Sequence, residues 1–272
     1  MDNNVSLIIP LGGRVNIVLL ERALKHARNS GHELIVVADR SPSVFSYDNY
    51  FDAIAIAKSM ADIFIESPEE SYFRRGGIWL KLQQGARVAS NPWVRFCGYD
   101  DLTYPSARVP PELNADAICT DVCIEDFGHG FQKIQLAPSS GVYAALRGWR
   151  NPFSFIGWTI SREFFTSPSI HEICLKGAFF FERALHVALF SSDWCCVRPS
   201  IFGGMPTRTE HRATISTQST QEDFVAKTRV AEGIAQYSSA ERMADWYSLK
   251  LHRRVALMIV KNIVRIGSCV RM

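Results

Sequence analysis

The sequence lacks several features that mark whole classes of protein. It contains no run of 18 apolar residues, so no segment has to span a membrane. Its seven cysteines form no C-x-x-C pair, and no second Cys/His pair has the spacing that a structural zinc site needs beside Cys119 and Cys123. An odd number of cysteines without an N-terminal signal peptide predicts reduced thiols in a cytoplasmic protein.

A strong net charge is also missing. The 30 Lys and Arg residues nearly balance the 27 Asp and Glu residues, which leaves +3 on 272 residues. This charge is too mild for an obligate nucleic-acid binder, so we expect no nucleic-acid partner. A hydrophobic fraction of 47% excludes a disordered chain and is typical of a globular protein with one large core or two modest ones.

The charge is unevenly distributed along the chain. Residues 250–272 hold six basic residues and no acidic one, so residues 1–249 carry a net charge of −3. Apolar residues at 251, 255, 258, 259 and 263 form one helical stripe between these basic side chains. Such a helix can rest on an anionic membrane surface or dock on the protein core, and both interpretations stay open.

The first hundred residues alternate between two hydrophobic periods. Short apolar runs predict buried strands at 5–9, 34–37 and 93–97, with a weaker strand at 53–57. Amphipathic patterns predict helices at 15–30 and 76–90. Alternating strands and helices favour an α/β fold with a mostly parallel, Rossmann-type sheet flanked by helices.

Further along, prolines divide the chain into short elements. The pattern predicts an antiparallel pair at 117–124 and 131–136, a helix at 177–190, a strand at 194–198, a polar mobile loop at 203–221 and a helical segment at 222–265.

Three carboxyl ends of predicted strands can be read in the sequence, and we call the residues 11–14, 39–41 and 98–101 the strand-end segments. Open α/β sheets bind ligands at the carboxyl ends of their strands, so these segments are expected to converge on one site. Asp100 and Asp101 are adjacent carboxylates whose repulsion a hard divalent cation would offset, which favours Mg²⁺ or Mn²⁺. A helix N-cap is the alternative interpretation of the same pair.

These motifs resemble those of family 2 glycosyltransferases, which are inverting enzymes with a GT-A fold. The resemblance covers about residues 5–216 and rests on three segments, which read V-S-L-I-I-P-L-G-G-R from Val5, I-V-V-A-D-R-S from Ile35 and C-G-Y-D-D-L-T-Y-P from Cys97. They match the family's first strand, its second strand and its metal-binding D-x-D segment. The resemblance implies donor contacts at Pro10, Arg14, Asp39 and Asp100, and a cation held mainly by Asp100 with Asp101 close by.

The sequence departs from the family pattern at several positions. Gly98 stands where the first aspartate of the D-x-D segment usually lies, Ala38 replaces an aspartate after the second strand, and Leu11 replaces a common threonine. Residues 77–85 match a family helix motif only at its glycines, and Lys81 falls near the usual arginine. Lys81 is therefore either a contact to a donor phosphate or part of a solvated helix face.

The resemblance also suggests a catalytic base. Residues 160–165 resemble the family segment that precedes the base, and Glu182 then falls where the family has an E-D pair. Apolar residues 179–181 would raise the pKa of Glu182 and strengthen it as a base toward an acceptor hydroxyl. In the alternative interpretation, Glu182 pairs with an arginine on a helix surface.

Two further sites complete the expected arrangement. His211, in a late polar segment, is a candidate third metal ligand, and Arg208 and Arg212 are candidate contacts to the leaving diphosphate. An exposed loop histidine is the alternative. Trp158 is a candidate contact to the acceptor sugar, although aromatic residues in strands usually belong to the core.

The sequence thus predicts a GT-A-like domain at 1–221 and a helical, basic C-terminal extension at 222–272. The expected activity is metal-assisted, inverting transfer of a sugar from a nucleotide-diphosphate sugar to a hydroxyl of a polysaccharide or lipid-linked glycan. This activity would take place in the cytoplasm, with membrane contact through 249–272. The alternatives are a non-catalytic nucleotide-sugar-binding or scaffolding protein, and a nucleotidyltransferase.

Overall fold

A seven-stranded sheet organises the chain. The computed structural model describes residues 3–12, 15–40, 49–67, 77–126, 131–137, 154–177, 185–186, 188–189 and 192–210. The strands of the large sheet are β1 (Val5–Leu11), β2 (Glu33–Asp39), β3 (Ile63–Ser67), β4 (Trp93–Phe96), β5 (Ala117–Cys119), β8 (Trp158–Ser161) and β9 (Trp194–Cys196). They lie in the order β3-β2-β1-β4-β8-β5-β9.

The sheet is mostly parallel. β3, β2, β1 and β4 run in the same direction, β8 is antiparallel to both of its neighbours, and β5 is parallel to β9. β1 and β2 are buried along nearly their whole length, as expected of central parallel strands covered on both faces. The α/β class with a mostly parallel sheet is therefore confirmed.

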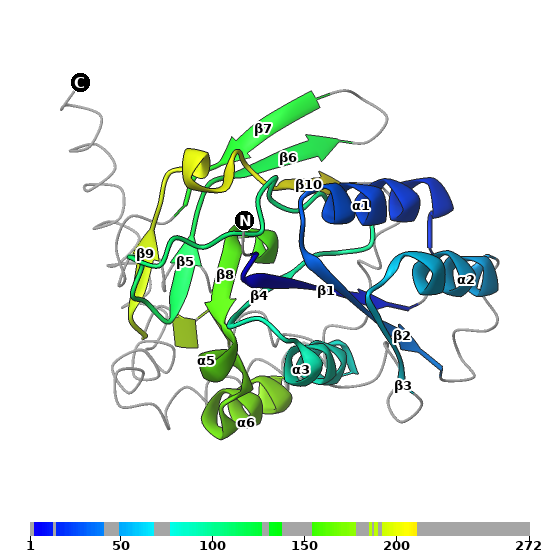
Figure 1. Cartoon of the computed structure of the whole chain (residues 1–272), viewed down its shortest axis with the longest axis horizontal. Helices are drawn as coiled ribbons and strands as arrows, with labels where there is room; N and C mark the ends of the chain where they lie inside the picture. The colour runs from blue at the N-terminus through cyan, green and yellow to red at the C-terminus, as the bar shows by residue number, and fades with distance from the viewer. Residues whose placement is uncertain are drawn as a thin grey trace, which may run out of the picture.

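Helices cover both faces of this sheet (Figure 1). α1 (Ile17–Asn29) and α2 (Tyr50–Met60) pack on one face, while α3 (Gly77–Val88), α5 (Arg162–Thr166) and α6 (Pro168–Gly177) lie on the other. The side chain of Asn16 caps α1 by accepting hydrogen bonds from the amides of Val18 and Leu19. The helix begins six residues after β1 ends at Leu11.

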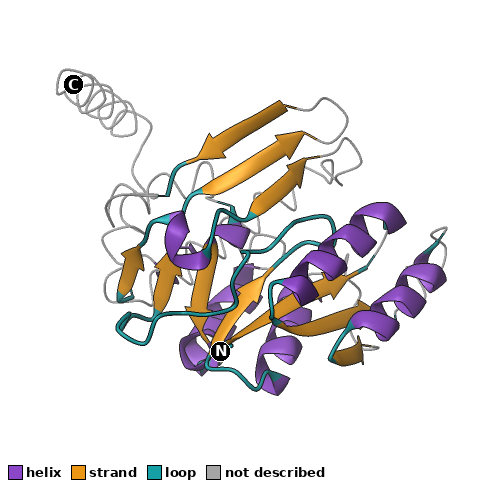
Figure 2. Cartoon of the chain, turned by 45° about the horizontal axis from the view of Figure 1, so that its top comes forward, coloured by secondary structure: helices purple, strands orange, loops and turns teal. Residues whose placement is uncertain are grey.

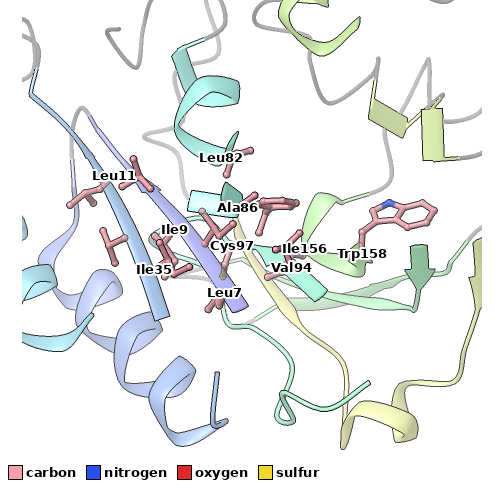
Figure 3. Close-up of a cluster of buried hydrophobic side chains, with 14 of the residues drawn as sticks. Leu7, Ile9, Leu11, Ile35, Leu82, Ala86, Val94, Cys97, Ile156 and Trp158 are labelled. Atoms are coloured by element: carbon pink, nitrogen blue, oxygen red, sulfur yellow. The ribbon is translucent and has the colours of Figure 1, made fainter. Parts of the chain in front are cut away.

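The main core cluster covers both faces of the central strands, because it includes buried residues of α1 and α2 as well as of α3 (Figure 3). Leu82 and Ala86 of α3 are buried together with Ile9 of β1 and Ile35 of β2. The contact is close, because a Cβ atom at Gly85 would lie 2.6 Å from Cγ2 of Ile8. Glycine at this position therefore lets the helix approach the sheet.

A second, smaller sheet stands beside the first (Figure 2). It contains β6 (Val122–Asp126), β7 (Phe131–Gln135) and β10 (Thr207–Glu210) in the order β10-β6-β7. β10 is parallel to β6, and β7 is antiparallel to β6. Two short 3-10 helices, η2 (Phe155–Gly157) and η4 (Pro199–Phe202), precede β8 and β10 along the chain.

The predicted strand at 53–57 is wrong, because these residues belong to α2. The alternation of alanine and isoleucine there imitates a strand period, yet the buried residues Tyr50, Ala53, Ile54 and Ala57 are spaced as one helix face. The third strand of the parallel set is β3, which follows this helix. A run of alternating small and large apolar residues satisfied both periods, and tertiary packing selected the helix.

Two other predictions need correction. The predicted strand 117–124 divides into β5 in the large sheet and β6 in the small one, and only β6 pairs with β7. Residues 207–210 of the predicted mobile loop form β10. The helical segment 222–265, the boundary near 221 and most of the predicted helix 177–190 lie outside the described residues.

Within the described residues, no helix combines the length and the apolar character needed to cross a membrane.

Candidate functional site

The three strand-end segments predicted to converge follow neighbouring strands of the large sheet. β2, β1 and β4 are neighbours and run parallel, so their carboxyl ends lie together. β4 ends at Phe96, opposite Ile8, three residues before β1 ends at Leu11. The turn that holds Asp100 and Asp101 therefore begins about 10 Å behind the end of β1, since each strand residue spans about 3.3 Å.

Two backbone amides hold the side chain of Asp101. The amide of Gly98 donates to Oδ2 over 3.1 Å, and the amide of Thr209 in β10 donates to Oδ1 over 2.8 Å. The next residue, Leu102, forms a bridge with Thr207 through two backbone hydrogen bonds of 2.8 Å each. The turn after β4 is thus fixed to a strand of the second sheet.

The position of Gly98 explains the missing first aspartate of the D-x-D segment. A Cβ atom at residue 98 would lie 2.7 Å from Oδ1 of Asp100 and 2.9 Å from Oδ2 of Asp101. Both carboxylates fold back over Gly98 and occupy the space that a side chain would need. The positions of the two carboxylates therefore require a glycine at residue 98.

Negative charge accumulates in this turn. Burial, followed by the charge of Asp100, raises the pKa of Asp101 to about 7, although the amides of Thr209 and Gly98 and the charge of Arg208 oppose this shift. The pKa of Tyr99 rises to about 12, again through burial first and Asp100 second. A cation or a positively charged side chain at this turn would relieve the repulsion.

Arg208 supplies positive charge close to the turn. It is exposed on β10, between the partly buried Thr207 and the buried Thr209. Its charge favours the ionised form of Asp101. The structure therefore places one predicted diphosphate contact near the predicted metal ligands, although the two come from different sheets.

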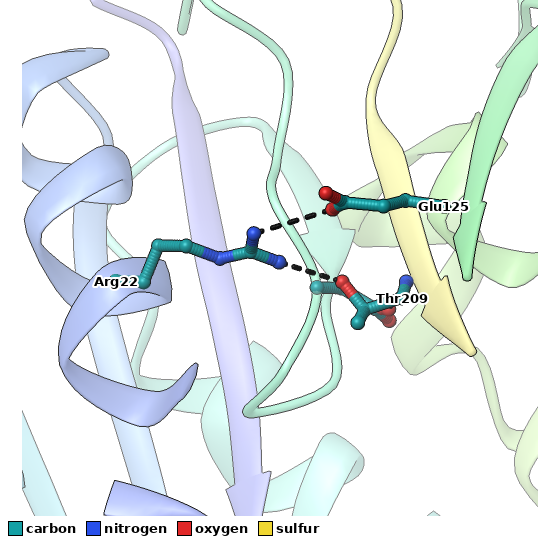
Figure 4. Close-up of polar contacts among 4 residues, drawn as sticks. Arg22, Glu125 and Thr209 are labelled. Carbon is teal, nitrogen blue, oxygen red and sulfur yellow. Dashed lines mark hydrogen bonds and ion pairs between the residues drawn. The ribbon is translucent and has the colours of Figure 1, made fainter. Parts of the chain in front are cut away.

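Arg22 is a site residue that the sequence did not single out (Figure 4). From α1 it donates to Oγ1 of Thr209 over 2.8 Å and pairs with Glu125 of β6 over 3.2 Å. Because Thr209 also binds Asp101, Arg22 connects the first helix to the strand that fixes the turn. No signal in the sequence selected Arg22, because it occupies a polar position in the amphipathic pattern of α1.

Lys81 and Asp39 form a buried ion pair at the end of β2. Nζ of Lys81 lies 3.8 Å from Oδ2 of Asp39, and both side chains are fully buried. The interpretation of Lys81 as part of a solvated helix face is therefore wrong. Tyr50 strengthens the same corner, because its hydroxyl donates to the carbonyl oxygens of both Asp39 and Leu11.

The remaining predicted residues are placed as follows. Pro10 is buried within β1, opposite Val37 of β2. Trp158 is fully buried in β8, with its ring 5.8 Å from that of Trp194. The core interpretation of Trp158 therefore replaces the predicted acceptor contact. Arg14, Glu182, His211 and Arg212 lie outside the described residues.

The part of the chain that the structure describes contains no group of three or more His, Cys, Asp or Glu residues suited to a metal ion. Asp100 and Asp101 thus provide two carboxylates, and the third predicted ligand, His211, is not among the described residues. The donor set still fits a hard cation. It consists of oxygen atoms from adjacent carboxylates, and a nearby carboxylate already destabilises the charge on Asp101.

Comparison with solved structures identifies the fold. The chain is similar to S. aureus TarS 1–349 in complex with UDP, with a TM-score of 0.56 and 14% identity over 89% of this chain and 68% of that one. For TarS 1–349 with UDP-GlcNAc the TM-score is 0.57 at 14% identity, over 89% of this chain and 69% of that one. A longer structure of S. aureus TarS gives a TM-score of 0.58 at 13% identity, over 89% of this chain and 41% of that one.

No protein-family model matches the chain, and no curated protein matches it significantly. The likeness to TarS at this identity establishes the fold alone. The GT-A-like fold expected from the resemblance to family 2 glycosyltransferases is therefore confirmed.

The buried pair predicts an asymmetric response to mutation. Lys81→Met removes the cation that faces Asp39 and should lower the free energy of unfolding by roughly 3 kcal/mol at neutral pH. The double variant Lys81→Met/Asp39→Leu should recover most of this loss, because it removes both charges from the interior. Urea denaturation of the single and double variants measures the difference. A double variant no more stable than Lys81→Met would contradict a significant interaction between the two charges.

The raised pKa of Asp101 predicts a pH dependence of stability without divalent cations. Asp101 keeps a proton in the folded state that the unfolded chain has released, in the window between about 4 and about 7. The free energy of unfolding therefore contains a contribution that falls as pH rises through this window. Asp101→Asn lacks this contribution, so wild type should lose stability relative to the variant as pH rises from about 5 to about 8.

Urea denaturation in the presence of a chelator, at several pH values, tests this prediction. Asp52→Asn is the matched control, because Asp52 is exposed on α2 and should follow wild type across the range. Parallel stability curves for wild type and Asp101→Asn would show that Asp101 does not titrate there.

Proposed function

We propose that the protein is an inverting glycosyltransferase that transfers a sugar from a nucleotide-diphosphate sugar to an acceptor hydroxyl. The observation that carries this proposal is the turn at Asp100 and Asp101, at the carboxyl edge of a GT-A-like sheet. The shared fold supports it, because TarS has been solved with UDP and with UDP-GlcNAc. Open α/β sheets bind nucleotides at this edge.

The donor site combines carboxylates with positively charged side chains. In the proposal, Asp100 faces the diphosphate side of the site, and Arg208, exposed on β10, binds diphosphate oxygens. Arg14 and Arg212 are further candidates for the same role. Pro10, Asp39 and Lys81 shape the corner between β1 and β2, where Lys81 fixes the carboxylate of Asp39.

A divalent cation fits this site. Both oxygens of Asp101 already accept a backbone amide, so Asp100 is the more direct ligand, with Asp101 beside it and His211 as the third candidate. When bound, Mg²⁺ or Mn²⁺ neutralises charge on a diphosphate leaving group. The protein's own contribution is to hold the carboxylate of Asp101 in a fixed orientation through the amides of Gly98 and Thr209.

The transfer requires a base for the acceptor. In the proposal, the carboxylate of Glu182 takes the proton of the acceptor hydroxyl as its oxygen attacks the anomeric carbon. The bond between that carbon and the diphosphate oxygen breaks in the same step, and the nucleoside diphosphate leaves with both electrons. Attack from the side opposite the leaving group inverts the configuration.

The acceptor and the location belong to the same proposal. A polysaccharide or a lipid-linked glycan would suit an enzyme in the cytoplasm, and the basic segment 249–272 could bring it to the cytoplasmic face of a membrane. This segment lies outside the described residues, so its role stays a prediction.

A donor screen tests the proposed function. UDP-, GDP- and dTDP-sugars are added with and without Mn²⁺, and both thermal unfolding and release of nucleoside diphosphate are followed. A donor present at about 100 times its Kd should stabilise the folded state by roughly 2.7 kcal/mol. Asp100→Asn should lose the Mn²⁺-dependent part of this stabilisation, whereas Asp52→Asn on α2 should retain it.

The products separate the alternatives. Release of pyrophosphate would identify a nucleotidyltransferase, and stabilisation without release of either product would favour a binding protein. If no nucleotide sugar stabilises the chain with or without Mn²⁺, the proposed function is wrong.

A second variant tests the base. Glu182→Gln should bind the donor as wild type does but lose transfer by about a hundredfold or more, because an amide cannot accept the proton. Glu163→Gln, at an exposed position of α5, is the matched control and should transfer normally. Normal transfer by Glu182→Gln would remove Glu182 from the role.

A further inference from the structure

A buried arginine lies behind the Asp100–Asp101 turn. Arg95 of β4 is 1% exposed, and no ion pair joins it to a carboxylate among the described residues. Its Nε donates to Oγ1 of Thr159 over 2.7 Å, and one terminal nitrogen donates to the carbonyl oxygen of Ser106, also over 2.7 Å. A buried cation without an acidic partner is costly, so its retention in the core calls for a specific reason.

Two aromatic rings provide part of that reason. The guanidinium carbon of Arg95 lies 4.0 Å from the ring centroid of Tyr104 and 4.3 Å from that of Phe202. The two rings also contact each other edge to face, with centroids 4.8 Å apart. The guanidinium is thus held by cation–π contacts where a carboxylate would otherwise be expected.

Both rings and Ser106 belong to the segments next to the Leu102–Thr207 bridge. Tyr104 and Ser106 follow the turn directly, and Phe202 ends η4, which leads into β10. We call Arg95 with the rings of Tyr104 and Phe202 the clamp. The two segments also approach each other beside it, because a Cβ atom at Gly204 would lie 3.2 Å from Cγ of Pro105. Arg95 therefore joins the two sides of the Leu102–Thr207 bridge from inside the protein.

We propose that Arg95 is a positioning residue that sets the geometry of the Asp100–Asp101 turn by joining residues 104–106 to η4. Its importance for a metal–nucleotide complex rests on the proposed function, whereas its effect on the turn does not. A lysine cannot replace it, because an ammonium group lacks the planar fork that reaches Thr159 and Ser106 together and stacks on two rings.

The first test compares Arg95→Lys with Arg28→Lys, which changes an arginine on the outer part of α1. UDP affinity is measured by calorimetry with and without Mn²⁺, together with thermal unfolding. Arg95→Lys should weaken Mn²⁺-dependent UDP binding by about tenfold, the effect typical of residues that orient metal ligands. UDP affinity without Mn²⁺ should stay unchanged. A purely structural role would lower Tm but leave the gain in affinity from Mn²⁺ as in wild type, and that result would overturn the proposal.

The second test needs no ligand and separates this proposal from the proposed function. Hydrogen exchange of the Gly98 and Thr209 amides, which both donate to Asp101, should accelerate in Arg95→Lys relative to amides in β2. If wild type binds no UDP, the proposed function fails and this measurement alone decides the role of Arg95. Unchanged exchange would overturn it.

If Arg95→Lys does not fold, Phe202→Leu replaces it in both tests. This variant keeps the arginine and its two hydrogen bonds but removes one ring of the clamp. It should show the same effects in the same direction, and exchange of both amides at the wild-type rate would overturn the proposal.

Discussion

The carboxylate of Asp101, held by the amides of Gly98 and Thr209, is the interaction on which the site depends. It joins the turn after β4 to β10 and so connects the large sheet to the small one. The interaction has a cost, because burial and the neighbouring Asp100 both disfavour the ionised form. The protein offsets part of that cost with two oriented amides and with the charge of Arg208. What remains is a carboxylate pair poised to gain from a nearby cation.

Buried charge is concentrated around this edge of the sheet. Lys81 and Asp39 form an ion pair at the end of β2, and the guanidinium of Arg95 lies against the two contacting rings of Tyr104 and Phe202 behind the turn. Buried charges of this kind contribute little to stability compared with apolar packing, but they fix orientation when each has a defined partner. Asp39 ends β2 and Arg95 lies one residue before the end of β4, so both buried charges lie near strands that lead to the site.

The sequence predicted the parts of the fold that rest on local periodicity. β1, β2 and β4 are mostly apolar runs, and the rule that parallel strands place their carboxyl ends together was enough to predict that these three strands end at one edge of the sheet. The alternating residues of 53–57 satisfied the helical period as well as the strand period, and packing against both α1 and β2 selects α2.

The rest of the site depends on contacts between residues far apart in the chain. Thr209 lies 108 residues after Asp101, in a polar segment with no sign of pairing to β6. Arg22 and Arg95 carried no sequence signal, because one resembles a surface residue of an amphipathic helix and the other sits in a short apolar strand. For Trp158 the sequence suggested a contact, but the side chain is fully buried. An aromatic residue near a binding segment cannot be distinguished in sequence from one in the core.

The central claim is that the Asp100–Asp101 turn binds a divalent cation together with a nucleoside diphosphate. Anomalous diffraction at the manganese edge, from crystals grown with UDP and Mn²⁺, tests it most directly. We expect an anomalous peak within direct coordination distance of the Asp100 carboxylate, with the diphosphate on the other side of the ion. Nucleotide bound elsewhere on the protein, or a manganese peak away from this turn, would contradict the claim.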